Sequence, residues 1–538
     1  MTSKVPMRWV AGWLLCAAAN VPASEIMSAY AEDVERFTRL LNSPVPERQV
    51  EGIQGLSFLK HWPAETQIVA LLTNAAPAVR REALAALARI GTGRSVPVLI
   101  QMLSAPEWEA RQTAADSLRR ITGQTLPTES PEAWEAWWKT TALPRERRWL
   151  LAQLSTATNA SPGQRGQWLA ALSRLAEPED EEACLQMLPR LSQAHPDPAE
   201  IRLVGELLER IGTARSLPVL TALRTEEAAW ALGRIGGAEA ERALLGWPRN
   251  LTVLINLDRL HSTNTGPWAA WLIRQMGLVT YRGQPDDLFH DEPQPIQRVA
   301  ANLILRSGQG PALVEVILRE LEETMEPPLA RGPRPAMTPD IAQLMAEMRE
   351  ELKPGFVRND GVTTAQPLTA LSFMARDRAL IPRLLPLLRH PAFVARIYVA
   401  MTLGRLRAHE ATPALLAVIR EGYNFADATA LASGKHFDQS QTVRWRGFLC
   451  LALGRIGGEE ARTALEQIAT DPNAYRDLRY GAVIGLRFTA SPQSLPALRH
   501  AASHDIIWMV RDAAREAALH IETLAREGEA ARQATAKP

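Results

Sequence analysis

One six-residue phrase, Leu-Gly-Arg-Ile-Gly-Gly, occurs twice in the chain, at 232–237 and again at 453–458. Each copy ends a run of small and apolar residues and leads into a second such run. Looser versions occur at 86–103 and 207–223. A helical run, a glycine stop and another helical run, repeated with drift, are typical of a helix pair used as a building unit. The phrase therefore predicts a repeat architecture.

The run at 79–91 shows the spacing of the second helix in each pair. Gly91 and Gly93 after it are predicted to supply the positive φ that ends a helix. Pro97 then falls in the first turn of the next helix, where its missing N–H costs nothing. The apolar stripe consists of Val79, Ala83, Leu84, Leu87 and Ile90.

A helix pair in which Val-Arg or Ala-Arg opens the second helix and a glycine follows it resembles the HEAT repeat. More narrowly, it resembles the short bacterial form named after phycobilisome bilin lyases. The resemblance covers 48–123, 201–245, 296–320 and 378–520. It implies an all-α fold, an α-α superhelix (HEAT/armadillo-type solenoid) with an irregular middle region. Since one pair cannot bury its apolar stripe alone, neighbouring pairs stack, and the second helices line the concave side.

The first 23 residues have the plan of a secretory signal peptide. Lys4 and Arg8 precede an apolar run from Trp9 to Ala19, and Val21-Pro22-Ala23 offers a cleavage site. This predicts an exported bacterial protein, periplasmic or extracellular, with no membrane attachment after cleavage. A buried N-terminal helix is the alternative.

The rest of the chain divides by how regular the repeats are. A helix with three tryptophans (Trp134, Trp137 and Trp138), which Ser130 can cap, is similar to a closing helix of exported bacterial HEAT proteins. We expect it to cap the first stack. The predicted parts are HEAT-like repeats at 24–125, Trp-containing capping or irregular helices at 126–200, HEAT-like repeats at 201–245, an irregular region with insertions at 246–370, HEAT-like repeats at 371–521 and a flexible tail at 522–538.

Charge and cysteine content exclude several classes of function. The net charge is +1, which argues against a nucleic-acid partner because such binding depends on neutralising phosphates. The chain has three cysteines, too far apart in sequence to form a disulfide or metal framework. They are Cys16, Cys184 and Cys450.

Six arginines form the strongest candidate binding surface. Each falls at or near the same position early in a second helix, so that stacking would align them along the concave face. They are Arg80, Arg111, Arg396, Arg446, Arg479 and Arg511. One interpretation is a groove for an acidic partner. The other is that each arginine pairs with an acid of the neighbouring repeat and only joins the stack together.

The insertion 422–446 is the second candidate. It separates a first helix from its second and lacks apolar periodicity. Insertions within repeats project on one face and often carry recognition. The candidate binding residues in it are Tyr423, Phe425, His436 and Phe437; an ordered loop without function is the alternative.

No catalytic, cofactor-binding or metal-binding set emerges. The acidic loop at 281–295 lacks the spacing of a calcium loop, and His500 and His504 are expected to diverge because His504 is expected in a turn. Deoxyhypusine hydroxylase, a HEAT-type enzyme family, uses His-Glu pairs at the starts of second helices. Arg81-Glu82 and Asp512-Ala513 stand at such positions here, so that activity is not implied.

The sequence leaves three functional hypotheses. The first is a non-catalytic scaffold that binds a protein partner, without a cofactor. The second is an enzyme or enzyme accessory subunit, lyase-like or metal-dependent, with its site in 246–295 or 422–446. The third is a structural spacer in a periplasmic assembly.

Overall fold

The computed structural model describes residues 25–74, 76–127, 130–140, 143–156, 160–193, 198–276, 295–330, 332, 334–353, 366–420 and 447–535. These residues form α-helices joined by short turns and include no strand. The fold is therefore the all-α solenoid that the repeats predict. Two compact units divide the chain: the N-terminal unit, Met27–Ser262, and the C-terminal unit, Thr263–Pro538, to which the residues up to Ile26 also belong.

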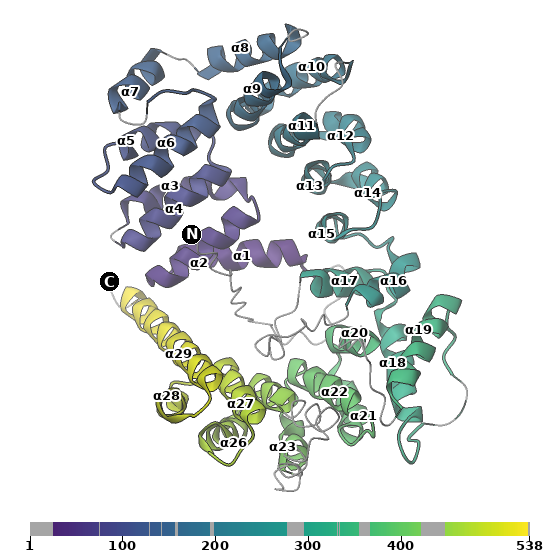
Figure 1. The fold of residues 1–538 in the computed structure, drawn as a ribbon. Coiled ribbons are helices and arrows are strands. Elements are labelled where there is room, and N and C mark those ends of the chain that lie inside the picture. The colour runs from purple at the N-terminus through teal and green to yellow at the C-terminus, as the bar shows by residue number, and fades with distance from the viewer. Residues whose placement is uncertain are drawn as a thin grey trace. The chain divides into compact units, whose positions relative to one another are not determined.

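The N-terminal unit has an inner and an outer layer of helices (Figure 1). The inner helices carry the apolar stripes that neighbouring repeats bury. They are α1 (Ala29–Leu41), α2 (Pro46–Phe58), α4 (Pro77–Ile90), α6 (Trp108–Thr122), α9 (Pro162–Leu175), α11 (Pro198–Ile211), α13 (Glu226–Ile235) and α15 (Leu251–Arg259). The outer helices are α3 (Glu65–Ala70), α5 (Val96–Met102), α7 (Pro131–Thr140), α8 (Leu143–Thr156), α10 (Glu181–Gln193), α12 (Leu217–Leu223) and α14 (Gly237–Leu245).

The inner layer of this unit closes on itself. Each inner helix contacts the next from α2 to α15, and α15 contacts α1, which contacts α2 (Figure 1). At the junction a carboxylate oxygen of Asp258 accepts the backbone N–H of Ala29 at 2.7 Å, satisfying a free donor at the start of α1. The guanidinium of Arg259 lies 4.3 Å from the centre of the Tyr30 ring. We call this closed inner layer the ring.

Buried carboxylates join successive outer helices. Glu65, the first residue of α3, accepts the backbone N–H of Thr92 at 2.7 Å and the hydroxyl of Ser95 at 2.5 Å. Glu181, the first residue of α10, does the same with Thr213 and Ser216, at 2.6 and 2.7 Å. Burial acts to raise the pKa of Glu181, but these hydrogen bonds lower it below its ordinary value. The Gly-Thr-x-Arg-Ser stretches at 91–95 and 212–216 thus donate the hydrogen bonds of a contact that occurs twice in this unit.

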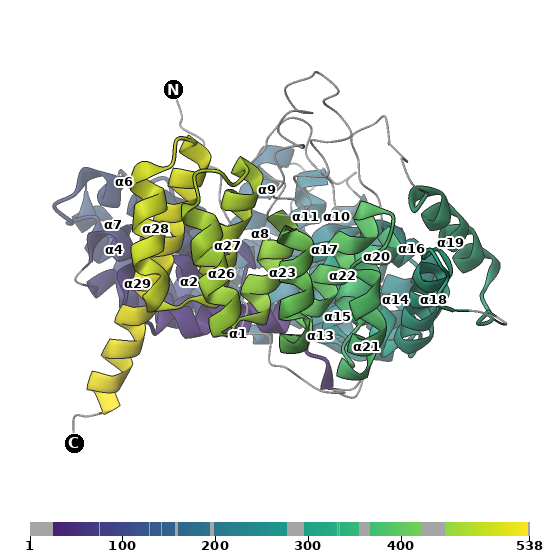
Figure 2. The same ribbon diagram turned by 90° about the horizontal axis from the view of Figure 1, so that it is seen from below.

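The C-terminal unit continues the same pairing of helices. At its end α26 to α29 lie side by side in both views (Figures 1 and 2). Its helices are α16 (Ala269–Gln275), α17 (Pro295–Arg306), α18 (Gly310–Glu323), α19 (Pro339–Glu351), α20 (Gln366–Met374), α21 (Ile381–Leu387), α22 (Phe393–Arg405), α23 (Thr412–Arg420), a helix at 447–456, α26 (Glu459–Thr470), α27 (Arg476–Thr489), α28 (Leu495–His504) and α29 (Trp508–Thr535).

The structure explains each glycine in the second copy of the Leu-Gly-Arg-Ile-Gly-Gly phrase. A Cβ on Gly454, the first glycine of the second copy, would lie 2.2 Å from the backbone oxygen of Gly485, so this glycine allows two helices to approach closely. The two glycines that end that copy, Gly457 and Gly458, have φ of 73° and 89°, which favours glycine because it has no Cβ to clash.

The expectation of positive φ at Gly91 and Gly93 was wrong. Gly91 is extended, with φ of −66°, and neither residue is among those with positive φ. Gly91 is required for another reason, since a Cβ there would lie 2.4 Å from the oxygen of Leu87.

Some predicted segments differ in their place or extent. The tryptophan helix α7 lies in the outer layer against α5, and α6 contacts α9 directly, so the repeats continue past it. Residues 522–535, expected to be a flexible tail, continue α29, because their Ala, Glu and Arg residues favour helix. The predicted signal peptide, 1–23, lies outside the described residues. No helix in the described part of the chain is long and apolar enough to cross a membrane.

Gly454→Ala should lower the free energy of unfolding by about 3 kcal/mol, since the added methyl group meets backbone that cannot yield locally. Gly528→Ala is the control: nothing lies within 4 Å of its Cβ position in α29, and a helical Gly→Ala change gains about 0.5–1 kcal/mol. Urea unfolding of the full chain measures both. Equal stability of the two variants would contradict the close-approach role of Gly454.

Candidate functional site

A series of arginines occupies the last turn of the inner helices in the N-terminal unit. Its members are Arg89, Arg120, Arg174, Arg210, Arg234 and Arg259, on α4, α6, α9, α11, α13 and α15. A cation is favoured there because the free carbonyls at a helix C-terminus carry partial negative charge. We call these residues the arginine band. It places positive charge at the C-terminal ends of these inner helices.

Three members of the band connect their helix to an earlier inner helix. Arg174 on α9 donates to the backbone oxygen of Arg89 on α4. Arg210 donates to that of Ser173 on α9 at 2.8 Å, and Arg234 to those of Glu209 and Gly212 at the end of α11. Each bond satisfies a carbonyl that the earlier helix leaves free. Burial lowers the pKa of the Arg210 guanidinium to about 10, which leaves it charged at neutral pH.

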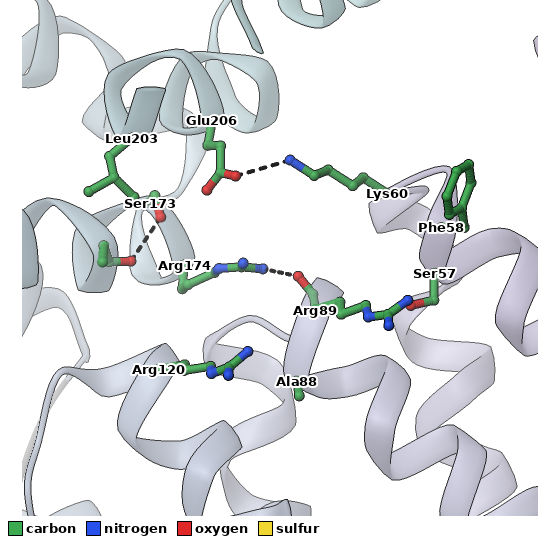
Figure 3. A pocket seen from close by; sticks show the side chains of 11 residues that line it. Ser57, Phe58, Lys60, Ala88, Arg89, Arg120, Ser173, Arg174, Leu203 and Glu206 are labelled. Carbon is green, nitrogen blue, oxygen red and sulfur yellow. Dashed lines mark hydrogen bonds and ion pairs between the residues drawn. The ribbon is translucent and has the colours of Figure 1, made fainter. Parts of the chain in front are cut away.

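A cavity of about 370 Å³ opens inside the N-terminal unit where the band begins (Figure 3). Four cationic side chains and one carboxylate line it, so its net charge is positive. The lining residues are Ser57, Phe58, Lys60, Ala88, Arg89, Arg120, Ala170, Ser173, Arg174, Leu203 and Glu206.

The cationic groups of the cavity differ in what they already bind. Lys60 forms an ion pair with Glu206 at 3.0 Å. Arg174 donates to a backbone oxygen, as above, and its guanidinium lies 4.8 Å from the centre of the Trp62 ring. The guanidiniums of Arg89 and Arg120 have no hydrogen-bond acceptor and no ion-pair partner within the ranges that the structure describes, although both are exposed. These two groups are therefore available to an anion.

Ser57 also lines the cavity, but its hydroxyl is not accessible from it. The side chain is buried at 3% exposure, and its Oγ is buried without a hydrogen-bond partner. A buried hydroxyl without a partner costs about 1–3 kcal/mol.

Next to the cavity lies a cluster of titratable groups at the ring junction. The hydroxyl of Tyr30 and Nδ1 of His61 are 3.1 Å apart. Glu209, one turn after Glu206 on α11, is 6% exposed, and its Oε2 has no hydrogen-bond partner. Burial raises the pKa of Glu209 to about 7, with Lys60 acting against the shift and Glu206 with it. This carboxyl is partly protonated at neutral pH.

The arginines predicted from the sequence have mostly local contacts. Arg80 donates to the oxygen of Asn74 at 2.9 Å, and Arg511 to that of Asp505 at 2.7 Å. Arg111 donates to Ala105 and Pro106, and Arg396 to His390.

Two of these arginines also pair with an acid of the next repeat: Arg80 with Glu107 at 3.5 Å, and Arg479 with Asp505 at 2.6 Å. These contacts favour the interpretation that the arginines join the stack. Arg80 and Arg111 lie in the N-terminal unit, and Arg396, Arg479 and Arg511 lie in the C-terminal unit. Arg446, Tyr423, Phe425, His436 and Phe437 lie outside the described residues, and their proposed role in binding stays a prediction.

The sequence contained the arginine band, but its pattern was missed. The arginine of Leu-Gly-Arg-Ile-Gly-Gly is itself Arg234, and an arginine precedes the stop of nearly every second helix in this unit. That recurrence at helix ends was the available signal.

The described residues include no group of three or more His, Cys, Asp or Glu side chains placed to hold a metal ion. The rings of His500 and His504 stack at 4.5 Å between centroids, because α28 extends through His504; the expectation that they diverge was wrong.

A family model described as HEAT repeats matches residues 34–119, 64–155 and 435–518. The matched regions contain α2, α4 and α6 of the ring and α26 to α28 of the second unit. This chain contains HEAT repeats. No curated protein matches the sequence of this HEAT-repeat chain.

A solved structure reported as "A conserved phosphorylation switch controls the interaction between cadherin and beta-catenin in vitro and in vivo" is similar over 91% of this chain and 98% of the other, with 11% identity. Its TM-score is 0.20, and no property of this HEAT-repeat protein follows from a likeness that weak.

Glu209→Gln should change how the stability of this protein depends on pH. The carboxyl has a higher pKa folded than its ordinary 4.5, so its contribution to stability is full below about pH 4.5 and is lost as pH rises through 7. Glutamine cannot ionise, so the variant should gain up to about 3 kcal/mol over the wild type at pH 8 relative to pH 4.5. Urea unfolding at both pH values measures this; a pH-independent difference would contradict the shifted pKa.

Proposed function

We propose that this HEAT-repeat protein is a non-catalytic interaction scaffold and that its ring holds an acidic segment of a partner protein. The observation that carries the proposal is the pair of unused guanidiniums, Arg89 and Arg120, on the wall of the cavity. Arginine binds carboxylates through two parallel hydrogen bonds, and these two have no other described partner. A segment that carries carboxylates supplies the acceptor oxygens for these two guanidiniums.

The construction of the ring favours binding of this kind. Inner helices that are fixed to both neighbours, with α15 joined to α1, hold the arginine band in place before a partner arrives. Binding to a site already formed loses less free energy to ordering. The arginine band also gathers positive charge at the C-terminal ends of the inner helices. This charge steers an acidic partner toward the cavity.

The proposal includes export. The signal-peptide plan of residues 1–23 supports a periplasmic or extracellular location in a bacterium, where the partner would also lie. The alternative enzyme hypothesis places the site in 246–295 or 422–446. Residues 277–294 of the first insertion and all of the second lie outside the described residues.

The double variant Arg89→Glu/Arg120→Glu should lose the partner. Affinity capture from the extract of the source cells, followed by quantitative mass spectrometry, should show at least about a tenfold loss of the captured protein, since two attractive charges become repulsive. Capture by the wild type should also weaken as salt rises, because exposed charges are screened.

The matched control is Arg81→Glu/Arg202→Glu. These exposed arginines lie on the same unit, on α4 and α11, outside the cavity lining, and the control makes the same change in net charge. The proposal requires that the control retain the captured protein. Equal capture by both double variants would refute it.

A further inference from the structure

Glu209 lies on α11 beside the cavity, and three charged side chains of the cavity lining interact with its carboxyl group. Glu206, three residues earlier on the same helix, lines the cavity and pairs with Lys60 at 3.0 Å. Side chains three residues apart on a helix are neighbours on its surface. The three lining residues that interact electrostatically with Glu209 are Lys60, Glu206 and Arg174. The charge state of Glu209 therefore changes the potential inside the cavity.

The carboxyl group of Glu209 is held where a negative charge is costly. Its side chain is 6% exposed, and its Oε2 has no hydrogen-bond partner in the described part of the chain. A buried carboxylate oxygen without a donor disfavours the ionised form. Burial accordingly raises the pKa of Glu209 to about 7, so that the neutral and the ionised form coexist at neutral pH.

The groups that face Glu209 from other elements keep their charge near neutral pH. They come from the turn after α2, from α9, α13 and α15, and from α1; they are Lys60, Arg174, Arg234, Arg259 and Tyr30. The segment of α12, which also contacts α11, has no titratable side chain. Burial raises the pKa of Tyr30 above its ordinary 10. Burial and Arg259 lower the pKa of His61, which is bonded to Tyr30, below its ordinary 6.5. Glu209 is therefore the member of this cluster that changes charge between pH 6.5 and 8.5.

We propose that protonation of Glu209 strengthens, and its ionisation weakens, binding of the partner's acidic segment in the cavity. When Glu209 is neutral, the four cationic groups of the lining are opposed by one carboxylate, that of Glu206. When Glu209 is ionised, a second negative charge repels the segment and competes with Glu206 for Lys60. The inference rests on the proposed scaffold function and names a regulation of that same site by pH.

The test uses an amidated peptide of six aspartates, labelled at its N-terminus with tetramethylrhodamine, and the full-length protein. The aspartates stay ionised above pH 6.5, and the emission of this dye does not depend on pH in this range. Fluorescence anisotropy should show that the wild type binds at least about threefold more tightly at pH 6.5 than at pH 8.5. Glu209→Gln should bind at both pH values as the wild type does at pH 6.5. The matched control, Glu239→Gln, removes an exposed carboxylate on α14 and should keep the pH dependence of the wild type.

Two further variants should move the midpoint of the pH dependence in opposite directions. Glu206→Gln removes the negative charge that raises the pKa of Glu209 and frees Lys60, so the midpoint should move to lower pH. Lys60→Gln removes a cation that lowers this pKa, so the midpoint should move to higher pH. Circular dichroism confirms that the variants fold. A structural role of Glu209 alone predicts neither shift.

Linkage requires the reverse effect as well. A bound acidic segment makes ionisation of Glu209 less favourable, so binding takes up protons close to neutral pH. Calorimetric titrations with the aspartate peptide at pH 7.5, in HEPES and in Tris, measure this uptake because the two buffers differ in ionisation enthalpy. The wild type should take up part of one proton for each peptide bound, whereas Glu209→Gln should take up none.

Each outcome decides the proposal. Binding by the wild type that does not depend on pH, or a pH dependence that persists in Glu209→Gln, overturns the regulation and leaves the scaffold function in place. If the peptide binds at neither pH, the cavity does not hold an acidic segment and the regulation falls with it. The capture experiment, which does not depend on this peptide, then decides the scaffold function separately.

Discussion

The free carbonyls at the C-terminal ends of the inner helices are the constraint on which the N-terminal unit depends. A helix leaves its last four carbonyls without an internal partner. Six inner helices of the ring bring such an end with an arginine in the last turn: α4, α6, α9, α11, α13 and α15. Arg174, Arg210 and Arg234 meet part of this deficit by donating to carbonyls at the end of an earlier inner helix. The same guanidiniums give the ring its positive charge, so one interaction both holds the repeats and prepares the interior for an anion.

The candidate site lies where that interaction stops. Arg89 and Arg120 occupy the same helical position as the other members of the band, but no described carbonyl receives their guanidiniums. Beside them the hydroxyl of Ser57 is buried without a partner. The cavity is thus marked by a break in a structural pattern, which distinguishes it from the rest of the ring interior.

Local features were predictable from the sequence because they depend on neighbours along the chain. Helical periodicity and the Leu-Gly-Arg-Ile-Gly-Gly phrase gave the helix pairs, and HEAT repeats are confirmed. Closure of the ring was not predictable, because the bond between Asp258 and Ala29 joins residues far apart in sequence and a repeat period does not say how tightly a stack curves. The contact of the Glu65 carboxylate with Thr92 and Ser95 was not predicted either, because it also joins residues on different helices.

The sequence predicted that arginines form the candidate site, but it did not predict which arginines. Arginine recurring in register was the right signal, but the predicted set lies at the helix starts, where Arg80 and Arg111 donate to carbonyls of the turn before their own helix. Distinguishing an occupied from a free guanidinium requires the positions of carbonyls on other helices, which periodicity does not contain.

Closure also limits how this unit can change over generations. An open stack of repeats can gain or lose a pair at little cost, because each pair touches only its neighbours. In a closed circle an inserted pair would separate α15 from α1, leaving Asp258 without its amide and the Tyr30 ring without its cation. Lengthening this unit by a repeat therefore costs it the contacts at the junction, a cost that an open array does not have.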